Sequence, residues 1–147
     1  MHAIAVVVMA LPMSSVAPPK PVMIVAHQST TIQQVVALTF ADEPFDVRSV
    51  GDGDAALSAI RGSKPAIAVV STDLPKQDGI QICEAMSKDP TLRKIPVLLL
   101  KYGHVSFDAD RATRAGCTSV LVLPLKPQEL IAKVKELVAA DPGKSKR

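Results

Sequence analysis

The sequence predicts an α/β protein built on a doubly wound, five-stranded parallel sheet with helices on both faces. Short apolar runs alternate with helical patterns five times between Pro21 and Ala139. Strands that alternate with helices of about 10–15 residues are typical of βαβ units. Two of the runs, 21–26 and 66–70, are almost continuously apolar, as expected for strands buried on both faces. The 147 residues are 48% hydrophobic and 21% charged, which suits one domain with an aliphatic core.

The first half of the domain contains two strand–helix units. Residues 21–26 (PVMIVA) are short, continuous and rich in β-branched residues, which predicts a buried strand. The hydroxyl cluster at 29–31 can cap the helix that follows, whose apolar residues recur at helical spacing. Residues 45–50 alternate like a strand with one solvated side. The run 51–54 (GDGD) then begins a helix that ends at Gly62.

The second half contains three more units. Residues 66–70 predict a strand, and a loop with Pro75 and Gly79 follows it. The later strands are expected at 96–100 and 118–123. One helix is expected on the apolar stripe Ile80, Ile82, Cys83 and Met86, and two more at 107–115 and 127–139. Five such units suit a flavodoxin-like fold with strand order 2-1-3-4-5, in which the ligand site lies outside the carboxyl ends of strands 1 and 3.

Charge and hydropathy argue against nucleic-acid and membrane binding. The net charge is +3, but three of the positive charges lie in the basic tail 141–147; without them, Lys and Arg equal the fourteen Asp and Glu. The apolar run 4–11 is too short to span a bilayer. We expect a disordered or mis-assigned leader at 1–19 and a single domain at 20–140.

Cys83 and Cys117 are the only cysteines, and both lie in largely apolar stretches. They are therefore expected to be free, buried thiols in the reducing cytoplasm. The sequence contains no CxxC motif and no Cys/His cluster, which excludes a structural zinc site of the usual spacing.

Four stretches carry a more specific signal. They are 69–79 (VVSTDLPKQDG), 95–100 (IPVLLL), 114–119 (RAGCTS) and 123–125 (LPL). In this order and at these spacings they resemble parts of the response-regulator receiver domain (CheY-like): the loop after strand 3, strand 4, the Ala-Gly-Ala turn into strand 5 and the Lys-Pro-Phe that ends it. The resemblance covers about residues 20–139 and implies a signalling module of two-component phosphorelays.

The resemblance implies a phosphorylation pocket, from which this chain departs at five positions. Receivers hold Mg²⁺ on an acidic pair after strand 1 and on the acceptor Asp that ends strand 3. His27 and Gln28 stand where the acidic pair belongs, and Ser71 stands at the acceptor position. Lys101 replaces the hydroxyl that ends strand 4, and Leu123 replaces the Lys that ends strand 5. We therefore expect a degenerate pseudo-receiver that takes up no phosphoryl group, metal or cofactor and is not an enzyme.

Asp73 and Lys101 need separate comment. Asp73 lies two residues past Ser71, a spacing that does not place its carboxylate in such a pocket. For Lys101 the sequence leaves two interpretations open. Its ammonium points back toward Ser71 and the carbonyls around Asp73, or it is solvated in a loop beside Tyr102.

The resemblance also implies a partner-binding face made by the fourth helix, fifth strand and fifth helix of the family. By pattern, its exposed positions here are Asp108, Arg111, Lys126, Lys133 and Glu136. The expected partner is another signalling protein, such as a kinase, an output domain or a scaffold. The chain itself is expected to be a monomer or a weak homodimer.

Two other functions stay open. The hydroxyl-rich run 28–31 leads into a helix N-terminus and could bind phosphate or nucleotide, as in a flavodoxin-like ligand-binding domain, although N-capping alone explains those hydroxyls. Adjacent strand ends could also bring His27 near Ser71, the minimal geometry of an activated nucleophile. Against this, no GxSxG motif or glycine-rich loop surrounds Ser71.

Overall fold

The computed structural model describes residues 20–103, 108–117 and 119–139. The expectations for the leader 1–19, for the tail 141–147, for Phe107 and for Thr118 lie outside these residues. In chain order the elements are β1 (Val22–Ala26), α2 (Thr30–Thr39), β2 (Asp46–Val50), α3 (Gly53–Ser63), β3 (Ile67–Ser71), α4 (Gly79–Ser87), β4 (Val97–Tyr102), α5 (Ala109–Arg114), β5 (Ser119–Leu123) and α6 (Pro127–Ala139). Among the described helices, none has the length and hydropathy needed to cross a membrane.

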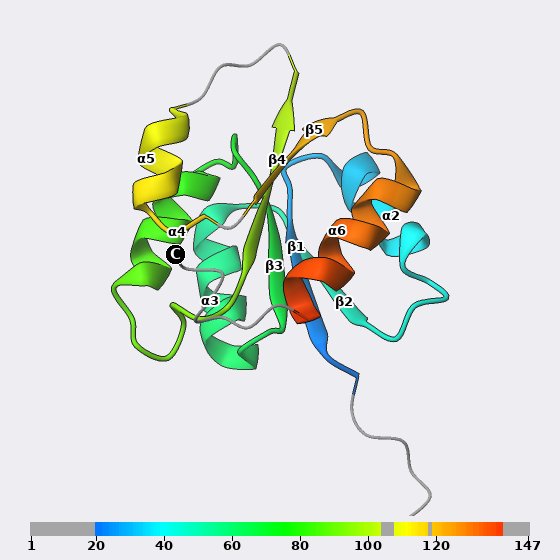
Figure 1. Cartoon of the computed structure of the whole chain (residues 1–147), viewed down its shortest axis with the longest axis horizontal. Helices are drawn as coiled ribbons and strands as arrows, with labels where there is room; N and C mark the ends of the chain where they lie inside the picture. The colour runs from blue at the N-terminus through cyan, green and yellow to red at the C-terminus, as the bar shows by residue number, and fades with distance from the viewer. Residues whose placement is uncertain (1–19, 104–107, 118, 140–147) are drawn as a thin grey trace, which may run out of the picture.

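The five strands form one parallel sheet in the order β2-β1-β3-β4-β5, which confirms the predicted fold class. Helices α2 and α6 cover one face, and α3, α4 and α5 cover the other (Figure 1). Side chains alternate along each strand. In β1, for example, Met23 and Val25 pack toward α2 and α6, whereas Ile24 and Ala26 pack toward α3 and α4. The sheet therefore separates two aliphatic cores.

Oxygen-bearing side chains cap four of the helices where they leave the carboxyl edge of the sheet. The N-caps are Ser29 for α2, Asp52 for α3, Asp78 for α4 and Asp108 for α5, and each accepts a hydrogen bond from a backbone N–H in the first turn. At Asp78 the Gln81 side chain also accepts a hydrogen bond from the Asp78 N–H, which completes a capping box.

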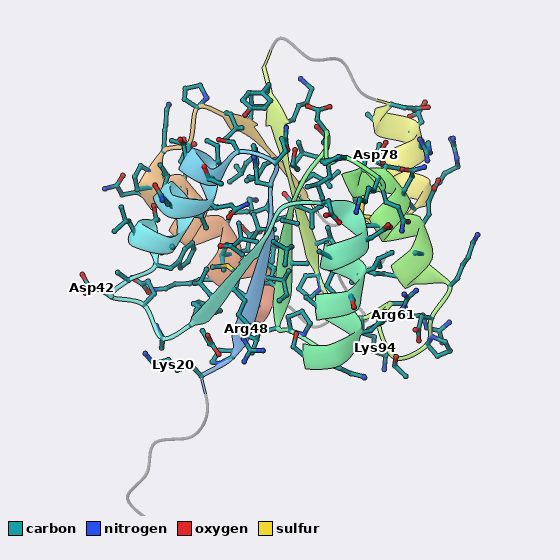
Figure 2. All side chains as sticks on the ribbon, turned by 180° about the vertical axis from the view of Figure 1, so that it is seen from behind. Lys20, Asp42, Arg48, Arg61, Asp78 and Lys94 are labelled. Carbon is teal, nitrogen blue, oxygen red and sulfur yellow. A yellow bond between two sulfur atoms is a disulfide. The ribbon has the colours of Figure 1, made fainter. Side chains whose placement is uncertain are left out.

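Charged side chains are distributed unevenly between the two edges of the sheet. Figure 2 shows Lys20, Arg48, Arg61 and Lys94 near the amino edge, whereas Asp78 lies toward the carboxyl edge. The carboxylate caps Asp52, Asp78 and Asp108 all belong to the carboxyl edge. This places acidic groups where helices start, as the helix dipole favours.

Two strands extend further than the sequence predicts. Ser71 is the last residue of β3 and is not part of the loop, and β4 continues through Lys101 and Tyr102, which were expected in a loop. The extension of β4 follows from its parallel ladder with β5, which pairs Lys101 with Val122 and Tyr102 with Leu123. Such pairing depends on a neighbouring strand and leaves no signal in local periodicity.

The two cysteines form a disulfide, so the expectation of free thiols is wrong. Cys83 lies on the buried face of α4, and Cys117 follows α5 in the turn toward β5. Their Cα atoms are 5.9 Å apart, within the range that a disulfide spans. The two residues are 34 positions apart in the sequence, and only the packing of α5 against α4 brings them together.

Gly79 begins α4 at a point where the helix closely approaches two strands. A Cβ atom at this position would lie 2.7 Å from the Ser71 carbonyl oxygen and 2.7 Å from Cδ2 of Leu99. The Asp-Gly pair seen in the sequence therefore has a packing role, because only a residue without a Cβ lets α4 pack this closely against β3 and β4. Gly62, near the end of α3, has nothing within 4 Å of such a Cβ.

We predict that Gly79→Ala lowers the free energy of unfolding by about 1–3 kcal/mol, because the added methyl overpacks the contact with β3. The matched control is Gly62→Ala, which should leave stability unchanged or raise it by up to about 1 kcal/mol, since alanine is the better helix former. Urea denaturation of both variants measures the difference. Equal stability of the two variants would contradict this account of α4 packing.

Candidate functional site

Four of the residues identified from the sequence lie together at the carboxyl edge of the sheet. His27 directly follows β1, Ser71 ends β3, Lys101 lies in β4 and Leu123 ends β5. Because these strands are neighbours in this order, the four residues occupy adjacent strand ends. Gln28 follows His27 but is exposed, so it lies outside the buried part of this edge.

His27 is fully buried and is held through its ring and its backbone. Its ring Nδ1 accepts a hydrogen bond from the Ser29 N–H at 3.0 Å, so Nδ1 carries no proton in this arrangement. The His27 N–H donates to the Val50 carbonyl oxygen at 3.1 Å, and the His27 carbonyl oxygen accepts from Nε2 of Gln33 at 2.7 Å. Gln33 also donates to the Val50 carbonyl at 3.2 Å, which ties the end of β1 to the end of β2. His27 and Gln33 therefore fix the start of α2.

The imidazole of His27 is predominantly neutral at pH 7. Burial lowers its pKa from the ordinary value of 6.5, and the negative charge of Asp73 raises it by a smaller amount. Because Nδ1 accepts a hydrogen bond, the proton lies on Nε2, which is buried without a hydrogen-bond partner. The Tyr102 ring packs edge-on against the imidazole, with ring centroids 5.8 Å apart. The sequence did not reveal the roles of Gln33, Tyr102 or Asp73 around His27, because all three contacts are non-local or cross the helix start.

Strand β3 ends in two hydroxyl side chains and an exposed carboxylate. Ser71 is fully buried, and its Oγ accepts a hydrogen bond from the Asp73 N–H at 3.0 Å. The Ser71 hydroxyl therefore bonds local backbone. Thr72 is also buried and its Oγ1 has no partner, whereas the Asp73 side chain belongs to an exposed residue. Ser71 is therefore a neutral group, and one lone pair of its Oγ is already engaged.

On the β4 and β5 side of this edge, the described positions of interest are Lys101 and Leu123. Along β4, Leu100 faces α6, and alternation puts Lys101 on the opposite face of the sheet from Leu100 and Tyr102. The Lys101 ammonium donates to the Tyr102 carbonyl oxygen at 3.1 Å. This placement does not fit the interpretation in which Lys101 points back toward Ser71. Leu123 is buried at the end of β5.

These residues do not fit Mg²⁺. Magnesium prefers hard oxygen ligands, usually carboxylates and water, in octahedral geometry. The ends of β1 and β3 instead offer a buried imidazole and a buried hydroxyl, and Asp73 is a single exposed carboxylate. Within the part of the chain that the structure describes, no group of three His, Cys, Asp or Glu side chains could hold a metal ion.

The two alternative functions gain no support from the geometry. The Ser29 hydroxyl accepts a hydrogen bond from the Ile32 N–H, so it serves as the N-cap of α2. Neither ring nitrogen of His27 hydrogen-bonds Ser71, since Nδ1 is taken by the Ser29 N–H and Nε2 has no partner. An activated serine needs such a bond to a base. Ser29, His27 and Ser71 therefore make contacts that hold the local backbone in place.

The five residues of the expected partner face differ in exposure. Three are exposed as expected: Asp108, Lys126 and Glu136. Arg111 and Lys133 are half-buried, so the expectation of exposure is wrong for these two. Arg111 lies on the side of α5 that faces α4, where its guanidinium pairs with Glu84 at 2.9 Å, and Lys133 pairs with Glu136 at 3.2 Å along α6. The helical pattern predicts which side of α5 faces away from the sheet, but it does not show that α4 lies beside Arg111 and partly covers it.

We predict that stability falls with acid through His27. The folded state binds the His27 proton less tightly than the unfolded state does, because burial lowers the pKa. The stability is therefore fully present above the ordinary pKa of 6.5 and is lost as the pH falls below it toward the lowered pKa. In His27→Asn, where the amide oxygen can still accept from the Ser29 N–H, this part of the pH dependence should disappear. Chemical denaturation between about pH 5 and 8 measures it.

The control for this experiment is Gln28→Asn, a change of the exposed neighbour of His27, which should retain the wild-type pH dependence. Identical pH profiles for wild type and His27→Asn would show that His27 is not the group responsible.

Comparison with known proteins identifies a family match over most of the chain. The family described as "Response regulator receiver domain" matches residues 22–135. The DNA-binding response regulator MtrA of Mycobacterium tuberculosis (strain ATCC 25618 / H37Rv) is 26% identical over 112 residues, which cover 76% of this chain and 48% of that protein. The alkaline phosphatase synthesis transcriptional regulatory protein PhoP of Bacillus subtilis (strain 168) is 30% identical over 94 residues, or 64% of this chain and 38% of that protein. The chain thus spans about half the length, or less, of these relatives.

Solved structures show the same fold. A putative response regulator from Chloroflexus aurantiacus J-10-fl has a TM-score of 0.76 at 24% identity, covering 82% of this chain and 98% of that one. The chemotaxis response regulator CheY4 of Vibrio cholerae has a TM-score of 0.73 at 21% identity, with 80% and 98% covered. Since the family match extends over most of the chain, this protein belongs to the response regulator receiver domain family.

Proposed function

We propose that this receiver domain works without phosphorylation, as a signalling module that acts by protein–protein contact. The observation that carries the proposal is the absence of charge at the ends of three strands, β1, β3 and β5. There His27 is a buried neutral imidazole, Ser71 a buried hydroxyl and Leu123 a buried aliphatic side chain. The resemblance to working receivers implies carboxylates and a lysine at these places, and none of those charges is present.

The substitutions support one another physically. Carboxylates that crowd one pocket need a metal ion or a cation to offset their repulsion. Once His27 and Ser71 replace them, a lysine at position 123 would be a buried cation without a partner, which is costly. Leucine at that position removes the cost. The five changes are therefore consistent with one coherent loss of phosphorylation chemistry.

Asp73 is the carboxylate to consider as a substitute acceptor. Its charge acts on His27, so it lies near the edge. Asp73 is exposed, and its backbone N–H donates a hydrogen bond to the Ser71 hydroxyl. A phosphoryl acceptor of this kind needs a metal to orient the donor. Among the described residues, the side chains around Asp73 do not supply a carboxylate set that fits one.

The proposed partner is another signalling protein: a kinase, an output domain or a scaffold. The proposal places the domain in the cytoplasm as a monomer or weak homodimer without nucleic-acid contact, and the DNA binding named for MtrA stays with that longer relative. In the cytoplasm thiols are kept reduced, so the Cys83–Cys117 disulfide is the feature on which this placement can be tested directly.

We predict no phosphoryl uptake. The full chain is incubated with acetyl phosphate or phosphoramidate and Mg²⁺, and its intact mass is measured under mild conditions that preserve acyl phosphates. The mass should stay unchanged, because no carboxylate lies beside a metal site. The matched variant is Asp73→Asn. A gain of one phosphoryl group in wild type that is absent from Asp73→Asn would overturn the proposal.

We also predict that Ser71→Asp does not restore the chemistry. The new carboxylate would be buried at the end of β3 without a lysine at position 123, which should lower the free energy of unfolding at pH 7 by about 3 kcal/mol. The control Ser71→Ala loses only a local hydrogen bond and should cost about 1 kcal/mol. Denaturation with and without Mg²⁺ gives both values. A Ser71→Asp variant that Mg²⁺ stabilises and that takes up a phosphoryl group would disprove this view of the pocket.

A further inference from the structure

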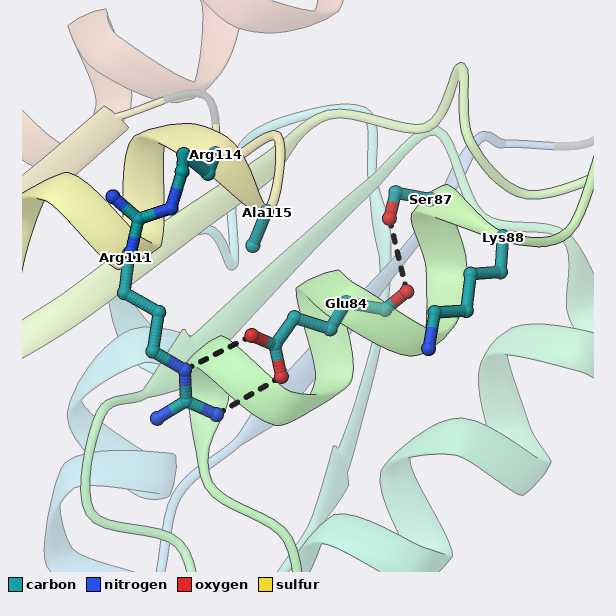
Figure 3. Close-up of a pocket in the computed structure, with 6 residues that line it drawn as sticks. All are labelled: Glu84, Ser87, Lys88, Arg111, Arg114 and Ala115. Carbon is teal, nitrogen blue, oxygen red and sulfur yellow. Dashed lines mark hydrogen bonds and ion pairs between the residues drawn. The ribbon is translucent and has the colours of Figure 1, made fainter.

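Helices α4 and α5 border a surface groove that the carboxyl edge does not use. Its volume is about 520 Å³. It is lined by Glu84, Ser87 and the C-cap Lys88 on the α4 side, and by Arg111, Arg114 and the C-cap Ala115 on the α5 side (Figure 3). Three of these six residues are cations, and one is an anion. The groove is therefore cationic by composition.

The one carboxylate of the groove is already neutralised. Arg111 donates from Nε and from one terminal nitrogen to the two carboxylate oxygens of Glu84, both at 2.9 Å. This bidentate geometry is the strongest form of the pair. These hydrogen bonds are the largest cause of the lowered pKa of Glu84, and the charges of Lys88 and Arg114 lower it further. Both of those cations therefore act on the same point of the groove.

Lys88 and Arg114 remain as an excess of positive charge. Both residues are exposed, and no ion pair within 4.0 Å joins either to a residue in the described ranges. A small adjoining cavity shares Ser87 and Ala115 with the groove and adds Arg93 to its wall. The groove thus continues toward another cation.

The walls of the groove are braced on both sides. The Glu84–Arg111 pair crosses from α4 to α5. Where the thiols are oxidised, the Cys83–Cys117 disulfide adds a second link from α4 to the turn after α5. A site whose two helices are tied together in the free protein loses little conformational entropy when it binds. The spacing between Lys88 and Arg114 is therefore set before any partner arrives.

We propose that the α4–α5 groove recognises an acidic segment of a partner protein, whose Asp or Glu side chains pair with Lys88 and Arg114. The inference rests on the proposed function, which requires a protein partner, and it names the chemistry of that partner. Exposed cations act mainly by attracting an oppositely charged surface and by raising the rate of association. They suit a carboxylate-bearing chain that lies along an open groove.

A small anion fits the observations less well. Tight phosphate sites use buried donors that point at the ligand, such as backbone N–H groups or arginines held in place. Within the described residues, the buried side-chain polar atoms without a partner are His27 Nε2 and Thr72 Oγ1, and both belong to the carboxyl edge. The groove itself offers exposed side-chain donors. We therefore favour the acidic protein segment.

A second groove provides a matched control. It has a volume of about 440 Å³ and is lined by Lys20 and Arg48 together with Asp46 and three apolar residues. Arg48 pairs with Asp46 at 2.9 Å, which leaves Lys20 as the excess charge. Reversing two cations here changes the net charge of the protein by the same amount as reversing Lys88 and Arg114.

The experiment measures binding of a fluorescein-labelled deca-glutamate peptide to the full chain by fluorescence anisotropy. Wild type should bind, and the affinity should fall as salt screens the exposed charges. Lys88→Glu with Arg114→Glu should weaken binding by about tenfold or more, because attraction becomes repulsion. Lys88→Gln with Arg114→Gln should give a smaller loss and avoids adding negative charge at the end of α4. Lys20→Glu with Arg48→Glu should change the affinity by less than about twofold.

Three results would overturn the inference. They are the absence of peptide binding, an equal loss in both charge-reversed pairs, and a groove that binds only duplex DNA, ATP or inorganic phosphate in place of the peptide. Repeating the titration with acetyl phosphate and Mg²⁺ separates this inference from the proposed function. Binding in both conditions supports both. Binding at the groove only with the phosphodonor keeps the groove and refutes phosphorylation independence.

Discussion

The burial of β3 on both faces is the constraint on which the rest of the structure depends. Every residue of β3, Ile67–Ser71, is buried, and β1 and β4 flank it on either side. A charge placed at the end of such a strand leaves water and needs an opposite charge or a metal nearby. Here that end carries the Ser71 hydroxyl, which the Asp73 N–H satisfies. A neutral strand end removes the demand for a cation, so Leu123 can close the edge as an aliphatic side chain.

The same constraint gives His27 a structural role. At the buried end of β1 its ring accepts the Ser29 N–H, and its backbone binds Val50 and Gln33. Each of these bonds holds the start of α2 or the neighbouring strand. A metal-binding carboxylate at this position would instead direct its oxygens at a ligand. The edge that serves chemistry in a phosphorylated receiver is thus used, in this proposal, to join β1, β2 and α2.

The sequence predicted those features that local patterns encode. The helix Pro127–Ala139 matches its predicted bounds, and Ser29 caps α2 as its hydroxyl suggested, because capping and helical periodicity involve residues only a few positions apart. Features that depend on a neighbouring element were missed. The extension of β4 through Lys101 needs β5 as a partner. The bond between Cys83 and Cys117 needs α5 to pack on α4.

The candidate site shows the same division. Aligning motifs along the chain singled out His27 and Ser71, and both lie at the ends of neighbouring strands. Their states did not follow: the neutral ring of His27 depends on burial, Ser29 and Tyr102, and the charge of Asp73 reaches it across a turn. Arg111 was expected on a partner face, but its guanidinium turns to Glu84 because α4 supplies the complementary charge.

That position of Arg111 also bears on how such a domain could signal. A ligand shifts a protein between two conformations only when it binds them with different affinity. In the proposed function, the uncharged ends of β1, β3 and β5 offer a phosphoryl group or a metal ion little on which to act. Helix α5 is held to α4 by the Glu84–Arg111 ion pair and by the adjacent disulfide. If nothing at these strand ends drives a movement and the ion pair opposes one, a single conformation of α5 is the state that a partner would recognise. Signalling by this domain would then depend on which partner is present and on the charge that the partner carries.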